Sequence, residues 1–233
     1  MDYQDRLVVV TGGTGALGAA VLGALLQAGA TCHVPYRSKA SLARSPHRGN
    51  PRVTFTALGD LADEDAVDRY YGGMQELWAS IHLAGAYGAA PIARSDKPLL
   101  QAQLEANLVS AYLCSRAAAV AFRRHGAGGR IVNVAARQAL EPRRGSGSLA
   151  YTISKAAVAA LTTALGAELA KEGILVNAVA PSIMDTPDNR AGQPDADFRA
   201  WPKVEEIAAA VLFLASPKNT VTSGAVIPVY GSA

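Results

Sequence analysis

The sequence predicts an α/β fold built on a doubly wound, parallel sheet of seven strands, in one domain spanning residues 1–233. Short runs rich in Val, Ile and Thr alternate with longer segments rich in Ala, Leu and Glu. A glycine-rich turn follows the first of these runs directly. Strand–helix alternation builds a parallel sheet with helices on both faces, because right-handed crossovers return each strand beside an earlier one.

The expected elements alternate in order along the chain. Strands are assigned to the short β-branched runs, and helices to the segments with strong helix formers. The expected strands are Leu7–Thr11, Thr31–Tyr36, Val53–Ala57, Ser80–Leu83, Arg130–Val134, Leu175–Ala180 and Ala225–Val229. The expected helices are Ala16–Ala28, Asp63–Tyr71, Leu99–Arg124, Tyr151–Lys171 and Val204–Leu214.

Composition argues against several protein classes. A net charge of +3 with dispersed arginines gives little support for nucleic-acid binding. Cys32 and Cys114 form no CxxC pair, so neither a disulfide framework nor a metal site is expected, and a reducing cytoplasm fits. Met1–Arg6 lacks the pattern of a signal peptide. Apolar runs such as Ala16–Ala28 are too short for the roughly 20 residues of a membrane span. We therefore expect a cytoplasmic protein without membrane contact.

The glycine-rich turn lies between the first strand and the first helix. Glycine permits positive φ and close approach of a phosphate, while the helix N-terminus directs N–H groups toward it. This context predicts a Rossmann-type dinucleotide site, with an ordinary tight turn as the alternative. The residues expected to bind the cofactor here are Gly12, Thr14, Gly15, Ala16, Leu17 and Gly18.

The end of the second strand predicts the choice of cofactor. An NAD site usually offers an acid there, whereas this chain has Arg37, followed by Ser38 and Lys39. A guanidinium can pair with a 2′-phosphate, so NADPH is expected in preference to NADH. The alternative is that these are ordinary exposed basic residues. Asp60 and Leu61, after the third strand, are expected near the adenine, although Asp60 could equally cap a helix.

Tyr151 and Lys155 are spaced so that they project from one helix face, one turn apart. An ammonium close to a phenol favours the phenolate, which predicts a lowered tyrosine pKa and acid/base chemistry. By spacing alone this pair is common on helices. The glycine-rich turn upstream makes the functional interpretation the stronger one.

These motifs together resemble the short-chain dehydrogenases/reductases, and the resemblance covers essentially the whole chain. It implies that Tyr151 transfers the proton, that Lys155 holds the nicotinamide ribose, and that Asn107 orders a water in the proton relay. Thr186 would contact the nicotinamide carboxamide. The further positions implied at the cofactor are Ala84, Gly85, Pro181 and Ile183.

The chain departs from the family pattern at the position of the usual catalytic serine, where Ala136 stands. Arg137, Gln138, Ser146 and Ser148 are candidate substitute donors, and the sequence does not choose among them. In addition, His82 replaces the first Asn of the usual Asn-Asn-Ala-Gly segment and is expected to be packed or cofactor-lining, and Ser182 replaces a glycine.

Two strings resemble dihydropteridine reductase, a family member that also lacks the serine: the turn from Gly12 to Gly18 and the segment from Asp185 to Trp201. A quinonoid pterin is therefore one candidate substrate. The expected activity is reduction of a carbonyl, imine or quinonoid small molecule. The competing hypothesis is a nucleotide-sensing or scaffold protein that has lost catalysis with the serine.

Two loops leave the carboxyl edge of the expected sheet, where ligands bind in open parallel sheets. They span Gln138–Ser148 and Ser182–Pro202, and the second is expected to form the substrate-side loop. The resemblance also implies a homodimer or homotetramer formed through the helices Leu99–Arg124 and Tyr151–Lys171. The alternative is that their alanines simply pack on the sheet.

Overall fold

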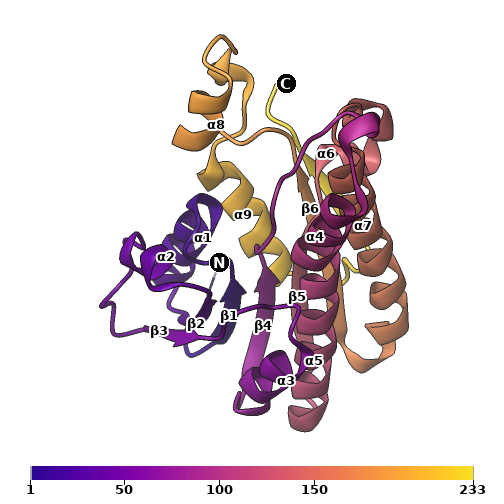
Figure 1. The fold of residues 1–233 in the computed structure, drawn as a ribbon. Helices are drawn as coiled ribbons and strands as arrows, with labels where there is room; N and C mark the ends of the chain where they lie inside the picture. The colour runs from indigo at the N-terminus through magenta and orange to yellow at the C-terminus, as the bar shows by residue number, and fades with distance from the viewer. Residues whose placement is uncertain (1, 233) are drawn as a thin grey trace.

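The computed structural model describes residues 2–232, in which the strands form one parallel sheet of seven strands in the order β3-β2-β1-β4-β5-β6-β7. The strand order reverses between β1 and β4, which makes their carboxyl ends the switch point of the fold (Figure 1). The strands are β1 (Leu7–Thr11), β2 (Thr31–Tyr36), β3 (Val53–Ala57), β4 (Leu77–His82), β5 (Gly129–Val134), β6 (Ile174–Pro181) and β7 (Val226–Val229).

The predicted fold class is confirmed, and every expected strand is present. The largest difference is at β4, which begins at Leu77 instead of Ser80. The Leu77-Trp78-Ala79 segment lacks β-branched residues, yet Leu77 and Ala79 are buried and pair with β1. Tertiary pairing therefore decides this boundary, and local propensity does not.

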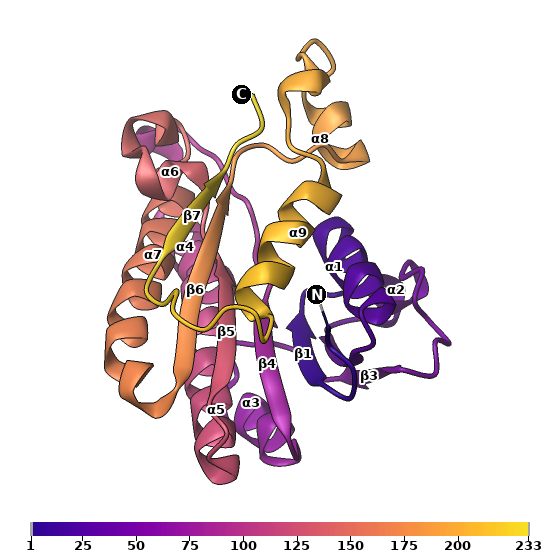
Figure 2. The same ribbon diagram turned by 180° about the vertical axis from the view of Figure 1, so that it is seen from behind.

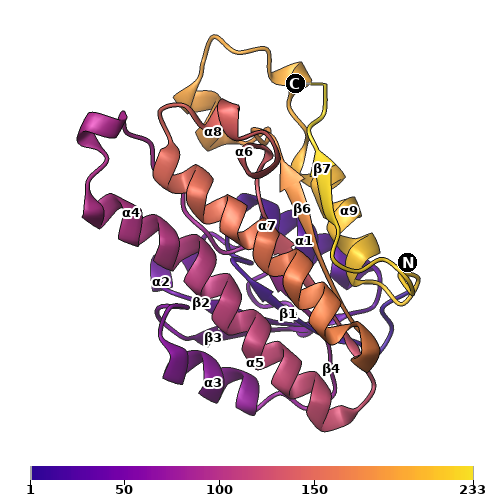
Figure 3. The same cartoon turned by 90° about the vertical axis from the view of Figure 1, so that its right-hand side faces the viewer.

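Helices cover both faces of the sheet. On one face lie α1 (Ala16–Gln27) and α9 (Val204–Ala215), which pack against each other (Figure 2). On the other face lie α3 (Glu64–Gly72), α5 (Ser110–His125) and α7 (Leu149–Leu169), with α5 and α7 side by side (Figure 3). Each layer has its own apolar core. The two cores hold the sheet rigid beneath its carboxyl edge.

The helix expected over Leu99–Arg124 is interrupted. It divides into α4 (Lys97–Gln103), a π-helical segment Leu104–Val109, and α5. Such single-turn π segments are frequent at functional sites, and this one contains the buried Asn107.

Short helices occur inside segments that were expected to be loops. They are α2 (Lys39–Ala43), α6 (Arg137–Leu140) and α8 (Pro187–Gly192). The last two lie in the loops beyond β5 and β6. Helix α7 begins two residues before Tyr151, which places this tyrosine in its first turn.

Within residues 2–232, one helical stretch, Leu149–Glu172, is long and apolar enough to cross a bilayer by length and composition alone. Only 33% of its most apolar window is buried. This stretch also packs against β5 and β6 and carries Tyr151 and Lys155. One such helix is weak evidence for a membrane span, because helices of folded domains can pass the same test.

Candidate active site

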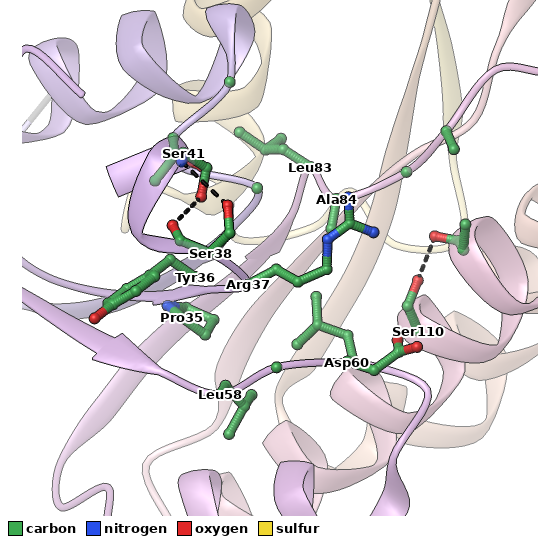
Figure 4. Close-up of a pocket in the computed structure, with 18 of the residues that line it drawn as sticks. Pro35, Tyr36, Arg37, Ser38, Ser41, Leu58, Asp60, Leu83, Ala84 and Ser110 are labelled. Carbon is green, nitrogen blue, oxygen red and sulfur yellow. Dashed lines mark hydrogen bonds between the residues drawn. The ribbon is translucent and has the colours of Figure 1, made fainter. Parts of the chain in front are cut away.

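A cavity of about 590 Å³ opens at the carboxyl ends of β1, β2 and β4 (Figure 4). It contains nine of the positions that were expected at the cofactor, which come from four separate segments of the chain. These are Gly12, Thr14, Gly15, Arg37, Ser38, Asp60, Leu61, Ala84 and Gly85. Segments far apart in the sequence therefore converge on one crevice at the switch point, where open α/β sheets bind their ligands.

Gly12 and Gly18 of the glycine turn have no room for a side chain. Gly12 has φ +69°, and a Cβ there would lie 2.6 Å from the Ala84 backbone nitrogen. A Cβ on Gly18 would overlap the backbone of Gly12 and Gly13. Gly15 is the N-cap of α1 and leaves the first N–H groups of that helix without a side-chain cap. The turn thus offers a bare backbone and a helix N-terminus, which fits a pyrophosphate.

Ala16, Leu17 and Gly18 do not line the cavity. Leu17 is buried in the core beside α9, and Gly18 is buried against the turn. Leu17 and Gly18 thus hold the turn against the helix, whereas Ala16 is exposed at the start of α1.

The Arg37 side chain extends into the cavity from the end of β2 (Figure 4). Ser38 is the N-cap of α2: its Oγ accepts from the Ser41 backbone nitrogen at 3.2 Å. Arg44, at the end of α2, also lines the cavity and was missed in the sequence because no motif contains it. Arg37 at the end of β2 and Arg44 at the end of α2 make this end of the crevice suited to an additional phosphate.

Asp60 lines the cavity, and its Oδ1 accepts from the Ala62 nitrogen at 2.9 Å. The cap of α3 is instead Asp63, whose Oδ1 accepts from the Ala66 nitrogen at 3.0 Å. Of the two roles that the sequence left open for Asp60, helix capping is therefore wrong.

Burial dominates the electrostatics of Tyr151 and Lys155. It raises the pKa of Tyr151 to about 12, with the neighbouring Tyr87 adding to the shift, and it lowers the pKa of Lys155 to about 8. The Lys155 Nζ donates to the Val134 carbonyl at 2.8 Å. The expected lowering of the tyrosine pKa is not seen: burial and Tyr87 raise the pKa of Tyr151, and Lys155 is not among the groups that shift it.

Asn107 links this pair to the crevice through Gly85. A Cβ on Gly85 would lie 2.6 Å from Asn107 Oδ1 and 3.3 Å from Lys155 Nζ. Asn107 Nδ2 also donates to Ser154 Oγ at 3.1 Å, on the helix that carries Tyr151. Asn107 and Lys155 thus meet behind Gly85, which lines the cavity, whereas Tyr151, Lys155 and Asn107 do not line it themselves.

Ala136 is buried and forms the N-cap of α6, without a side-chain oxygen to cap it. Of the four candidate substitutes, Arg137 donates from Nε to Glu141 at 3.0 Å, and its guanidinium lies 4.5 Å over the Tyr230 ring. Ser148 Oγ donates to the Gly145 carbonyl at 3.3 Å. Arg137 and Ser148 therefore both have partners in the loop beyond β5.

His82 is part of a buried polar chain inside the sheet. Its Nε2 lies 2.8 Å from Ser80 Oγ, and its Nδ1 lies 2.8 Å from Asn133 Oδ1. The hydrogen bonds extend further on both sides. Ser80 Oγ lies 2.7 Å from the Tyr71 hydroxyl, and Asn133 Nδ2 donates to Thr162 Oγ1 at 3.0 Å. Burial lowers the pKa of His82 to about 4. His82 is therefore a packed, neutral side chain, the first of the two roles expected for it.

Pro181 ends β6 and Ile183 and Thr186 follow it, and none of the three lines the cavity. Thr186 is the N-cap of α8, where its Oγ1 accepts from the Asn189 nitrogen at 3.2 Å. The substrate-side loop is braced by its own contacts: Arg190 pairs with Asp185 at 2.6 Å and lies 4.9 Å over the Phe198 ring. This loop carries two short helices and an ion pair beside the carboxyl edge.

Tyr87 is the most prominent residue that sequence reasoning missed. Its ring centroid lies 4.9 Å from that of Tyr151, with 73° between the ring planes. Its position two residues after Ala84-Gly85 was the available signal, since the segment after β4 leads into the crevice.

Comparison with known proteins identifies the family of this chain. Residues 6–197 match the family model of short chain dehydrogenases. A galactitol 2-dehydrogenase of Rhizobium johnstonii is 33% identical over 98% of this chain and 97% of its own length. The 3-oxoacyl-acyl-carrier-protein reductase MabA of Mycobacterium tuberculosis is 30% identical over 98% and 93%. A structure of ElxO with NADP bound shares the fold, with a TM-score of 0.87, 22% identity and 97% of each chain covered. The chain belongs to the short-chain dehydrogenase/reductase family of NAD- or NADP-dependent oxidoreductases.

Proposed function

We propose that this chain is an NADPH-preferring reductase of a carbonyl, imine or quinonoid small molecule, with Tyr151 as the proton donor. The observation that carries the proposal is the junction at Gly85, which joins the nucleotide crevice to Asn107 and Lys155. Arg37 and Arg44 in the same crevice support NADPH over NADH. The NADP named in the ElxO structure is consistent with this choice.

A bound nicotinamide supplies the hydride of such a reduction. The protein's part is the proton. With its pKa raised to about 12, Tyr151 stays protonated at neutral pH and is a donor to the oxygen or nitrogen that gains charge. With a pKa of about 8, Lys155 remains mostly charged at pH 7 and stabilises the phenolate that is left. The pair is therefore set for proton donation in the reductive direction.

The alanine at position 136 bears on the substrate class. An isolated ketone concentrates negative charge on one oxygen during reduction, and a hydroxyl beside it stabilises that charge. Conjugated rings and imines spread or avoid this charge, so they need such a donor less. Ala136 thus favours a delocalised acceptor, and a quinonoid pterin is one candidate.

The test is a Tyr151→Phe variant, assayed for turnover and separately for NADPH binding by fluorescence. We expect loss of at least a hundredfold in kcat with unchanged NADPH affinity, because only the proton donor is removed. Tyr70→Phe, which removes a buried hydroxyl on α3 outside the cavity, is the matched control. Unchanged turnover in Tyr151→Phe would contradict the mechanism. A chain that binds NADPH but reduces nothing across ketones, imines and quinones would favour the nucleotide-sensing alternative.

We also infer that two copies associate through α5 and α7. A groove of about 320 Å³ runs between these helices, and it combines apolar side chains with charges of both signs. Tyr112 and Val120 are half exposed there, and Arg123 and Glu168 supply opposite charges that a two-fold related copy can match. A Val120→Glu variant should elute as a monomer in size-exclusion chromatography if this face is the interface. If the wild type and Val120→Glu elute at the same volume, this face is not the interface.

A further inference from the structure

Tyr87 presents a large aromatic surface to solvent beside the proton donor. It is 67% exposed, whereas the Tyr151 side chain that it touches is largely enclosed. Exposed single aromatic residues are common, and exposure alone indicates nothing. Contact with the group that we assign as proton donor is the feature that separates Tyr87 from the other exposed aromatic residues.

The backbone on either side of Tyr87 is fixed. Ala86 exchanges two hydrogen bonds with the Asn107 amide, at 3.0 and 2.9 Å. Gly88 packs so closely against α4 that a Cβ on it would lie 2.9 Å from the Gln103 amide nitrogen. A bridge between Ala90 and Ser148 ties the segment to the loop that precedes α7. The ring is therefore exposed on a rigid support, so it can bind a ligand with little loss of conformational entropy.

The geometry of the two rings defines a corner. They meet at 73°, so a planar ligand stacked on the free face of Tyr87 stands at the same steep angle to the Tyr151 ring. Offset stacking on a tyrosine selects flat, conjugated ligands, because the attraction grows with the overlapping π surface. An acyclic, sp³-rich substrate gains much less from such a wall.

We propose that Tyr87 determines substrate specificity by stacking against a planar, conjugated ring and holding its reducible edge toward Tyr151. The inference rests on the proposed function for the role of Tyr151. It extends that function by naming the residue that selects the substrate class. Stacking on Tyr87 would also compensate for Ala136, because it orients the substrate at a site where the usual serine hydroxyl is missing.

Binding to a complex without a hydride donor tests the proposal independently of turnover. Biopterin and menadione serve as planar probes, and each is titrated by calorimetry into the protein saturated with NADP. The variants are Tyr87→Leu, which removes the aromatic face, and Tyr87→Phe, which keeps it. Ile92→Ala is the matched control, since Ile92 lies on the same segment and is 72% exposed. NADPH affinity and melting temperature are measured for every variant to verify the fold.

We expect Tyr87→Leu to weaken binding of at least one probe about tenfold, which corresponds to about 1.4 kcal/mol. Tyr87→Phe should bind within about twofold of the wild type, and Ile92→Ala should bind like the wild type. In steady state, Tyr87→Leu should raise KM for menadione and leave KM for 3-pentanone unchanged.

The inference is overturned if neither probe binds the wild-type complex, or if both bind Tyr87→Leu with wild-type affinity. Failure of the proposed function gives a different result. If the proposed function is wrong, Tyr151→Phe turns over substrate like the wild type. Loss of probe binding in Tyr87→Leu would still show that Tyr87 binds the ring.

Discussion

Asn107 holds the Ala86 backbone with both ends of its side-chain amide: Oδ1 accepts from the Ala86 nitrogen at 3.0 Å, and Nδ2 donates to the Ala86 carbonyl at 2.9 Å. The side-chain amide of a helical residue thus forms the same pair of hydrogen bonds with a loop residue that two backbones form in a sheet. It fixes the segment that carries Gly85 toward the cofactor crevice and Tyr87 toward Tyr151. The π-helical turn that contains Asn107 allows the side chain to reach this backbone.

Replacing Asn107 with Asp should therefore destabilise the protein and impair catalysis. The change keeps the acceptor for the Ala86 nitrogen but sets a second oxygen against the Ala86 carbonyl, in a position that is 1% exposed. We expect the free energy of unfolding to fall by about 3 kcal/mol, measured by urea denaturation. Asn50→Asp, at a half-buried surface turn, is the control and should change it by less than about 0.5 kcal/mol. Equal stability of the two variants would contradict this role.

Arg37→Asp should reverse the cofactor preference. Loss of a charge-assisted hydrogen bond and gain of a repulsive carboxylate should raise the Kd for NADPH about tenfold to a hundredfold, while NADH binding is kept or improved. Fluorescence titration with both cofactors measures this. Arg48→Asp makes the same charge change at an exposed arginine that does not line the cavity, so it serves as the control. If both variants lose NADPH affinity equally, general electrostatics is responsible and Arg37 has no special role.

The buried His82 should make the protein sensitive to acid. Its pKa is about 4 in the folded chain against an ordinary value of 6.5, so the unfolded chain binds the proton more readily. Stability from this residue is complete above pH 6.5 and is lost as the pH falls toward 4, by at most about 3 kcal/mol. Urea denaturation between pH 7 and 4 should show this slope in the wild type and a smaller one in His82→Asn. Identical slopes would show that other groups cause the acid sensitivity.

The sequence predicts the sheet well because β-branched runs and the glycine turn carry their own local signals. It does not predict the break in the long helix, because the π-helical turn depends on the bonds between Asn107 and a backbone twenty-one residues away. The nine crevice residues were predictable from motif and strand end. The pKa of Tyr151 was not, since spacing reveals a neighbouring ammonium but no measure of burial. For Tyr87, the sequence offered its position after Ala84-Gly85, but the contact of its ring with Tyr151 is visible only in the fold.

Restoring a hydroxyl at Ala136 should improve both stability and reaction with simple ketones. Ala136 is the N-cap of α6 with extended backbone, at φ −159° and ψ 163°, where a serine oxygen can accept from the first turn of the helix. The gain should be about 0.5–1 kcal/mol, measured by urea denaturation. The same hydroxyl would stand where the family's usual serine acts, so kcat/KM for cyclohexanone should rise about tenfold, with a smaller rise for menadione.

Ala135→Ser is the control for Ala136→Ser. Ala135 is equally buried but is not a helix cap, so its hydroxyl lacks the first turn of α6 as a partner and should lower stability. If Ala136→Ser is stabilised but gains no activity on cyclohexanone, the hydroxyl caps the helix without reaching the substrate. Ala136 would then not be the reason for a preference for conjugated rings, and the contact between Tyr87 and Tyr151 would have to account for it alone.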